Sequence, residues 1–132
     1  MYRNPALAVD AVVIKNGRIL LVRRKNEPYK GKLALPGGFV EYGERTEDAV
    51  LRELREETVM EGKVKKLVGV FSDPGRDPRG HVVSIAYLIE PKSEEVRAGD
   101  DAAECEWVRI ENARDLAFDH ADIIKKALEA ME

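Results

Sequence analysis

Apolar residues in the first 24 positions form two runs of the kind found in β-strands. Residues 6–15 (ALAVDAVVIK) and 18–24 (RILLVRR) are rich in Val, Ile and Leu, and Asn16-Gly17 between them is the dipeptide most typical of a two-residue hairpin. Further β-rich runs follow a short LAL segment at 33–35. The pattern therefore predicts additional strands at 63–72, 81–90 and 104–110.

Helical periodicity is clear in two later segments. Residues 46–58 place Val50 and Leu54 on one stripe, and Thr46, followed by two acidic residues, suits the N-cap of this helix. A second helix is predicted after Asp119, which would cap it. Its apolar face would carry Ala121, Ile124, Leu128 and Met131. This order of elements predicts an α/β (α+β) fold, a mixed sheet with helices packed on it.

Composition limits the kinds of function. The 132 residues carry a net charge of −3, which argues against a nucleic-acid or membrane-surface partner. The single cysteine, Cys105, excludes an internal disulfide framework and fits a reducing compartment. The first ten residues lack the pattern of a signal peptide, and no apolar run approaches the roughly 20 residues that span a bilayer. We expect a single cytoplasmic domain, 1–132.

Three glutamates dominate one edge of the first predicted helix. At about 100° per residue, Glu53, Glu56 and Glu57 fall within an arc of about 100°. One interpretation is a solvated, salt-bridged surface, because Arg52 is spaced to pair with Asp48 and with Glu56 at i,i+4. The other interpretation is a site for a hard divalent cation, which prefers several oxygen ligands.

The surroundings of the cluster favour the metal site. Gly37 and Gly38 precede it and provide backbone that a ligand can approach closely. Glu44 adds a further carboxylate ahead of the helix, and Arg52 is placed to hold Glu56 without neutralising the whole cluster. Oxygen donors of this kind suit Mg²⁺, which completes its coordination with water and phosphate oxygens.

The same residues resemble the signature of a known family. Gly38, Glu44 and the run 52–57 (RELREE) have the types and spacing of the Nudix hydrolase box. The resemblance implies an α/β/α sandwich and metal-dependent hydrolysis of a nucleoside diphosphate linked to another moiety, with Mg²⁺, or Mn²⁺ in its place. It also implies metal ligands at Glu53, Glu56, Glu57 and the Gly37 carbonyl, supported by Arg52 and Glu44.

One position departs from the box. The family places a glycine where this chain has Val59, and a β-branched residue disfavours the left-handed conformation that such a glycine adopts. We therefore expect the helix to run on to Gly62 or to end in another kind of turn. The proposed ligands precede Val59, so activity should survive the change.

The general base has candidates inside and outside the box. Glu53 is the candidate within it. Glu104 and Glu106 lie two positions apart on a predicted strand, so both point to the same face and could reach the metal across the sheet, with Glu104 ranked first. The alternative for these two is an ordinary solvated strand face.

Residues beyond the box point to the substrate. The loop 71–81 (FSDPGRDPRGH) with Pro74 resembles the ADP-ribose pyrophosphatase branch of the family, and Arg76 and Arg79 in it suit phosphate recognition. The alternative is a polar surface turn whose arginines only solvate it.

The segment 116–123 (LAFDHADI) resembles the same branch. Phe118 could stack on adenine, His120 lies close to the expected cap of the last helix, and Arg24 ends a strand near the site. A histidine near a helix start is more often local structure than a ligand, and Arg24 could be an ordinary strand-end charge.

These observations predict a Mg²⁺-dependent enzyme that cleaves ADP-ribose to AMP and ribose 5-phosphate. Two alternatives stay open, a hydrolase of oxidised or non-standard nucleoside triphosphates and a non-catalytic ADP-ribose-binding domain. A sensor of this kind would need a DNA-binding module, whereas one domain accounts for these 132 residues. The family resemblance also implies a homodimer.

Overall fold

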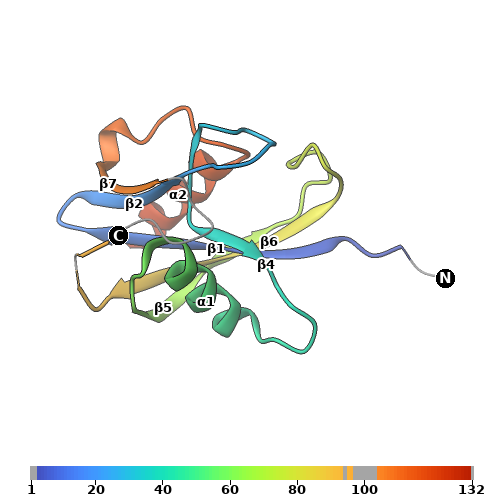
Figure 1. Ribbon diagram of the computed structural model, residues 1–132, viewed down its shortest axis with the longest axis horizontal. Coiled ribbons are helices and arrows are strands. Elements are labelled where there is room, and N and C mark those ends of the chain that lie inside the picture. Colours follow the sequence, from blue (N-terminus) through green and yellow to red (C-terminus); the bar gives the residue numbers. More distant parts are fainter. Residues whose placement is uncertain (1–2, 94, 97–103, 132) are drawn as a thin grey trace.

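The computed structural model describes residues 3–93, 95–96 and 104–131. Within these residues, four strands come before the first helix and three more before the last (Figure 1). In chain order the elements are β1 (Ala6–Lys15), β2 (Arg18–Arg23), β3 (Leu33–Ala34), β4 (Gly37–Phe39), α1 (Thr46–Thr58), β5 (Gly62–Phe71), β6 (Val82–Pro91), β7 (Glu104–Arg109), the 3₁₀ turn η1 (Ile110–Asn112) and α2 (His120–Ala130).

The strands form one mixed sheet. Its order is β3-β2-β1-β6-β5, with β4 paired to β1 and β7 paired to β2. Strands β1 and β6 run parallel, and the other pairs are antiparallel. Asn16 and Gly17 join β1 to β2 with φ values of 54° and 74°, the left-handed conformations that a tight hairpin requires. The predicted hairpin and mixed sheet are confirmed.

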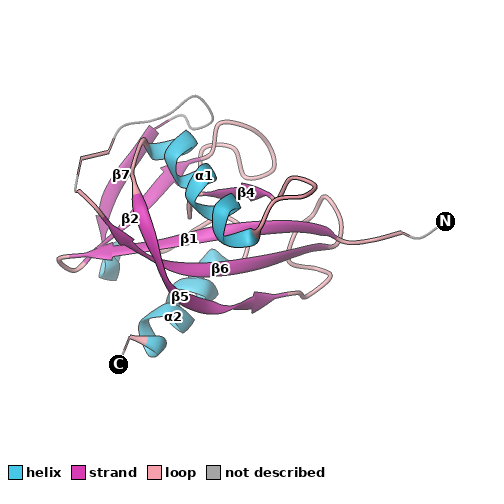
Figure 2. Cartoon of the chain, turned by 90° about the horizontal axis from the view of Figure 1, so that it is seen from below, coloured by secondary structure: helices cyan, strands magenta, loops and turns pink. Residues whose placement is uncertain are grey.

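The two helices lie on opposite faces of the sheet (Figure 2). Because side chains alternate along a strand, β1 contributes to two cores. Val9, Ala11 and Val13 pack with α1, whereas Val12 packs with α2. The fold is therefore an α/β/α sandwich, and by the same alternation Asp10 lies on the α2 side. None of the helices in the described residues is long and apolar enough to cross a membrane.

The capping of the two helices agrees with the prediction only in part. Arg45, not Thr46, is the N-cap of α1, and the Thr46 hydroxyl lies 2.7 Å from the Tyr87 hydroxyl. Asp119 is the N-cap residue of α2 as predicted, but its carboxylate makes no capping bond because it pairs with Arg76. The Asp119 side chain that the sequence assigns to helix capping is instead bonded to Arg76, a residue of a distant loop.

The buried face of α2 is also rotated from the prediction. Ile124 is buried as expected, but Ala121 and Met131 are exposed. The buried residues are His120, Ile123, Ile124 and Ala127. A pattern of hydrophobic residues does not place a histidine in the core. His120 begins the buried face of α2 because it has buried polar partners, the Leu35 N–H and Asp10.

The end of α1 corrects the prediction at Val59. The helix stops at Thr58, and Val59 itself adopts the left-handed conformation, with φ 62°, donating its N–H to the Arg55 carbonyl. Neither continuation to Gly62 nor another turn occurs. The next residue explains why, because Met60 is buried in the core beside α1 and its N–H donates to the Thr58 hydroxyl. Core packing therefore imposes a backbone conformation that valine disfavours.

Candidate active site

The predicted glutamate arc forms on α1. Glu57 is only 8% exposed, and its carboxylate accepts the Gly37 N–H at 3.2 Å. The Glu53 side chain is 12% exposed and lies against Gly38, while the Glu56 side chain is more open to solvent. The three carboxylates thus extend from the interior beside β4 toward the surface.

Gly37 and Gly38 let β4 lie close to α1 and to β1 at the same time. A Cβ at Gly38 would lie 2.5 Å from the Glu53 carboxylate. A Cβ at Gly37 would lie 2.2 Å from the Val9 carbonyl and 2.6 Å from the Asp10 carboxylate. Real Cβ atoms do not approach other atoms this closely, so Gly37 requires glycine beside the fixed Val9 backbone, and a side chain at Gly38 would displace the Glu53 carboxylate. Strand alternation therefore turns Gly38 toward the glutamates and Gly37 toward the opposite face of the sheet.

Arg52 organises the acidic cluster. Its guanidinium donates to the two oxygens of Glu44 at 2.7 and 2.9 Å, to Glu53 at 2.8 Å and to the Phe39 carbonyl at 3.1 Å. A longer contact of 3.3 Å reaches Glu56. The hydrogen bonds from Arg52 lower the pKa of Glu44 to about 2, so this carboxylate is charged at neutral pH.

The glutamates fit a hard divalent cation by their chemistry. In the part of the chain that the structure describes, no three His, Cys, Asp or Glu side chains converge closely enough to enclose an ion. Glu53 instead faces Arg52, and Glu57 faces the Gly37 amide. All the same, three carboxylates share one arc beside exposed strand backbone, and two of them are largely buried. This donor set consists of oxygen alone, as Mg²⁺ and Mn²⁺ prefer.

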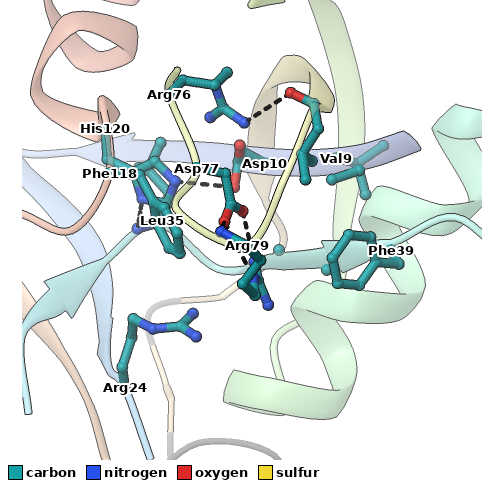
Figure 3. A pocket seen from close by; sticks show the side chains of 14 residues that line it. Val9, Asp10, Arg24, Leu35, Phe39, Arg76, Asp77, Arg79, Phe118 and His120 are labelled. Atoms are coloured by element: carbon teal, nitrogen blue, oxygen red, sulfur yellow. Dashed lines mark hydrogen bonds and ion pairs between the residues drawn. The ribbon is translucent and has the colours of Figure 1, made fainter. Parts of the chain in front are cut away.

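A pocket opens on the other side of β4. Asp10 from β1, Gly37 and Gly38 from β4, and three loops enclose it. Figure 3 shows the side chains that point into it. Those that the chemistry depends on are Asp10, Arg24, Phe39, Arg79, Phe118 and His120.

Two cations and two aromatic rings meet in this pocket. The Arg24 guanidinium lies 5.0 Å from the Phe118 ring centroid, and that of Arg79 lies 5.5 Å from Phe118 and 5.1 Å from Phe39. Burial, and then the neighbouring charge of Arg79, lower the pKa of Arg24. Two like charges held this close favour an anionic ligand, and the rings offer flat surfaces for stacking.

Arg76 lines the pocket but has an internal partner. Its side chain is 5% exposed and forms a two-bond fork with Asp119, at 2.6 and 2.8 Å. Burial by itself lowers the pKa of Arg76, but the hydrogen bonds that it donates to Asp119 raise this pKa overall. The Arg76 guanidinium, which the sequence suggested for phosphate recognition, therefore bonds the loop 71–81 to the start of α2.

Asp77 holds the second arginine of the same loop. This buried carboxylate accepts from the Arg79 side chain at 2.7 and 3.1 Å and from the Arg79 backbone N–H at 2.9 Å. The Arg79 side chain remains 43% exposed, so it can contact a ligand while Asp77 orients it.

Glu104 is not brought to the site. Its carboxylate is 58% exposed and pairs with Arg23 at 2.6 Å, and Glu106 lies 3.7 Å from the same guanidinium. The intervening Cys105 packs with the core on the α1 side, so the two glutamates point away from that helix. Glu104 and Glu106 therefore match the alternative interpretation, an ordinary solvated strand face. Burial raises the pKa of the Cys105 thiol, in keeping with an unreactive side chain.

Comparison with known proteins decides the family. The chain matches the family model described as NUDIX domain over residues 4–130. The protein belongs to the Nudix family.

Three proteins similar to this Nudix domain are named for ADP-ribose. An ADP-ribose pyrophosphatase of Methanocaldococcus jannaschii is 54% identical over 125 residues, covering 95% of this chain and 74% of that protein. An ADPR-responsive transcriptional repressor of Acinetobacter baylyi is 35% identical, and the match covers 96% of this chain and 54% of the repressor. A bifunctional NMN adenylyltransferase/ADP-ribose pyrophosphatase of Francisella tularensis, complexed with AMP and a Mn ion, superimposes with a TM-score of 0.88 at 35% identity, covering 99% of this chain and 43% of that one.

Sequence reasoning missed several residues in or beside the pocket next to β4. Asp10 is the one polar residue in the run 6–14, a signal that could have marked it, and Asp77 lies between the two arginines that were considered. Tyr29 packs edge-on against Phe118, with ring centroids 4.8 Å apart, and no local pattern indicates that contact. Phe39 is within the box, but its role depends on Arg79, 40 positions later.

Proposed function

We propose that this protein is a divalent-metal-dependent pyrophosphohydrolase that cleaves ADP-ribose to AMP and ribose 5-phosphate. The observation that carries the proposal is the position of β4, which separates the glutamates of α1 from the arginine–aromatic pocket by the width of one strand. A pyrophosphate lying at Gly37 and Gly38 can therefore be contacted from both sides. The relatives named above support ADP-ribose as the substrate.

Glu53, Glu56 and Glu57 are the residues that would hold the metal, together with the Gly37 carbonyl. A bound divalent cation supplies neutralisation of the phosphate charge and a lower pKa of the attacking water. Arg52 and Glu44 fix the carboxylate arc, since the Arg52 fork spans Glu44 and Glu53. Mg²⁺ is the proposed ion, and Mn²⁺ has the same preference for oxygen donors.

The reaction is a hydrolysis in which one water is consumed. The water oxygen attacks one phosphorus of the pyrophosphate, the bridging phosphorus–oxygen bond breaks, and the bridging oxygen leaves on the other phosphate. The water proton passes to a carboxylate, for which Glu53 is the candidate at the site. Because Glu104 pairs with Arg23 on a solvent-facing part of the sheet, we assign no proton transfer to it.

The arginine–aromatic pocket would hold the nucleotide. Phe118 offers a stacking surface for adenine, and Arg24 and Arg79 offer charge for the pyrophosphate. Arg76 and His120 serve the pocket through their internal partners, because both side chains are buried and bonded within the protein.

The decisive experiment incubates the purified protein with ADP-ribose and Mg²⁺, with and without EDTA, and separates the products by chromatography. We expect EDTA-sensitive release of AMP and ribose 5-phosphate, faster than hydrolysis of other dinucleotides or of oxidised dGTP. Running the reaction in H₂¹⁸O identifies the attacked phosphorus, because the label enters only one product. Cleavage of the triphosphate alone would reject the assignment of the pocket while retaining that of the glutamates.

The metal assignment is tested with Glu57→Gln. This change removes a charge from the buried carboxylate beside Gly37, so we expect turnover to fall by at least about 100-fold with the melting temperature nearly unchanged. Glu61→Gln is the matched control, because Glu61 is exposed and lies 3.9 Å from its partner Arg55. Near-parental turnover of Glu57→Gln would exclude this ligand set.

A second candidate function is non-catalytic binding of ADP-ribose, favoured by the similarity to an ADPR-responsive repressor. Calorimetry distinguishes the two functions. Tight ADP-ribose binding without release of AMP, under conditions in which Mg²⁺ also binds, would support the sensor. The homodimer and the cytoplasmic location remain predictions, which light scattering and cell fractionation test.

A further inference from the structure

A buried histidine joins the two halves of the proposed site. His120, at the first turn of α2, is 5% exposed. Its Nδ1 atom lies 3.0 Å from the N–H of Leu35, 85 positions earlier, and its Nε2 atom lies 3.5 Å from the Asp10 carboxylate (Figure 3). Because Leu35 is also buried, its N–H needs this acceptor.

The contacts assign the protonation state of the ring. The Leu35 N–H donates to Nδ1, so Nδ1 carries no proton and the imidazole is neutral. The proton is then on Nε2, which faces Asp10. The other Asp10 oxygen accepts the hydroxyl of Ser84, so the partners of this carboxylate come from β6 and α2. His120 thus accepts at Nδ1 while its Nε2 proton faces Asp10, an arrangement that the imidazolium cation cannot make because its Nδ1 would carry a proton.

The residues after Leu35 lead directly into the metal-holding region. The Pro36 carbonyl accepts the Ala11 N–H at 2.8 Å, and the Gly37 N–H donates to Glu57. The segment 35–37 is therefore bonded to His120 at one end and to a proposed metal ligand at the other. Gly37 is also paired with Asp10 across β1 and β4, so its backbone is held by the sheet as well.

The same histidine contacts the nucleotide side. Its ring lies 5.3 Å, centroid to centroid, from the ring of Phe118, two residues before it. Phe118 has φ 53°, a conformation that costs energy in a residue other than glycine and that aims its ring into the pocket. His120 therefore contacts both the aromatic surface and the residue that begins the segment 35–37.

We propose that His120 is a positioning residue which, through its Nδ1 bond to Leu35, sets the Gly37–Glu57 contact and thereby the affinity of the site for divalent metal. The proposal rests on the proposed function for the identity of the metal ligands. It assigns His120 no contact with substrate and no proton transfer.

Two variants separate the two ring nitrogens. The side-chain oxygen of asparagine can take the place of Nδ1, whereas the amide of glutamine reaches the place of Nε2 and leaves the Leu35 N–H without an acceptor. We expect His120→Gln to weaken Mn²⁺ binding to the ligand-free protein, measured by electron paramagnetic resonance, by about 10- to 100-fold. His120→Asn should remain within about threefold of the parent.

The measurement uses no nucleotide, so it stands apart from the test of the substrate. Failure of the parent protein to hydrolyse ADP-ribose would count against the proposed function, whereas equal Mn²⁺ affinity in the parent and His120→Gln would overturn the role of His120. Equal loss in both variants would also overturn it, because the effect would then not depend on the Leu35 bond.

A measurement on the parent protein guards against variants that do not fold. Nitrogen-15 NMR of the histidine ring near neutral pH should show Nδ1 unprotonated and Nε2 protonated. A ring protonated on Nδ1 would contradict the Leu35 bond and with it the proposal.

Discussion

The guanidinium of Arg52 binds the carboxylate of Glu44 through two parallel hydrogen bonds, of 2.7 and 2.9 Å. The same arginine reaches Glu53 at 2.8 Å, so one planar group links the loop before α1 to the middle of the helix. A planar fork of this kind fixes direction as well as distance. The proposed metal ligands are therefore oriented before any ion binds.

Replacement of Arg52 by lysine tests this orientation. Lysine keeps the charge but cannot make the fork and the Glu53 contact together. We expect Mg²⁺-dependent turnover to fall by about 10- to 100-fold, mainly through a higher Mg²⁺ concentration for half-maximal activity. Arg55→Lys, at an exposed position of the same helix, should behave like the parent. An unchanged Mg²⁺ dependence in Arg52→Lys would show that the fork does not orient the ligands.

Gly38→Ala should separate activity from stability. Its Cβ would meet the movable Glu53 carboxylate at 2.5 Å, so the side chain moves away and the fold persists. We expect turnover to fall by about 100-fold, because displacement of a catalytic group by about 1 Å has effects of this size. The free energy of unfolding, from urea titration, should change by less than about 1 kcal/mol.

Two other glycines serve as comparisons for Gly38. Gly37→Ala should unfold the protein or destabilise it severely, because its Cβ would meet the Val9 carbonyl, a backbone atom, at 2.2 Å. Gly75→Ala should be neutral, since the nearest atom would lie 3.5 Å away. Full activity of Gly38→Ala would contradict the close approach of β4 to Glu53.

Val59→Gly should stabilise the protein. Val59 holds a left-handed conformation at the end of α1, which costs an L-residue about 1–2 kcal/mol, and glycine adopts it freely. We expect a gain of about 1 kcal/mol in the free energy of unfolding, with turnover within about twofold of the parent. The control is Val70→Gly, because Val70 has comparable exposure but lies in strand β5, where glycine destabilises. Destabilisation by Val59→Gly would mean that the valine side chain contributes more than its backbone strain costs.

The pKa of His120 predicts a loss of stability in mild acid. Burial lowers this pKa and outweighs Asp10 and Asp119, which favour the cation, while Arg76 and Arg24 oppose it. The unfolded chain therefore binds a proton near its ordinary pKa of about 6.5, when the folded protein does not. Below that pH the free energy of unfolding should fall, by up to about 1.4 kcal/mol per pH unit, until the folded-state pKa is reached.

Urea titrations between pH 8 and pH 5 measure this effect. The parent should be stable and insensitive to pH above about 7, and His120→Asn should lack the loss that the histidine contributes below it. A parent protein that became more stable as pH fell from 7 to 5 would show that His120 is charged in the folded state.

Local patterns in the sequence were enough to predict much of the architecture. The Asn16-Gly17 turn, the strands beside it and the glutamate arc of α1 follow from periodicity and turn chemistry over a few residues, and the structure confirms them. These features are predictable because each depends on neighbours in the chain. The Nudix box adds the spacing between Gly38, Glu44 and the helix, which is also local.

The tertiary structure alone decided which side chains have partners elsewhere in the fold. Arg76 bonds to Asp119 instead of facing a ligand, Glu104 bonds to Arg23 instead of reaching the helix, and His120 binds Leu35. Each pair joins residues more than 40 positions apart, so no short-range pattern contains both members. Each of these side chains pairs with the group that the fold brings next to it, and for the buried Arg76 and His120 such a partner is required. The conformation of Val59 is also decided by tertiary packing, because the burial of Met60 requires a left-handed backbone at the preceding valine.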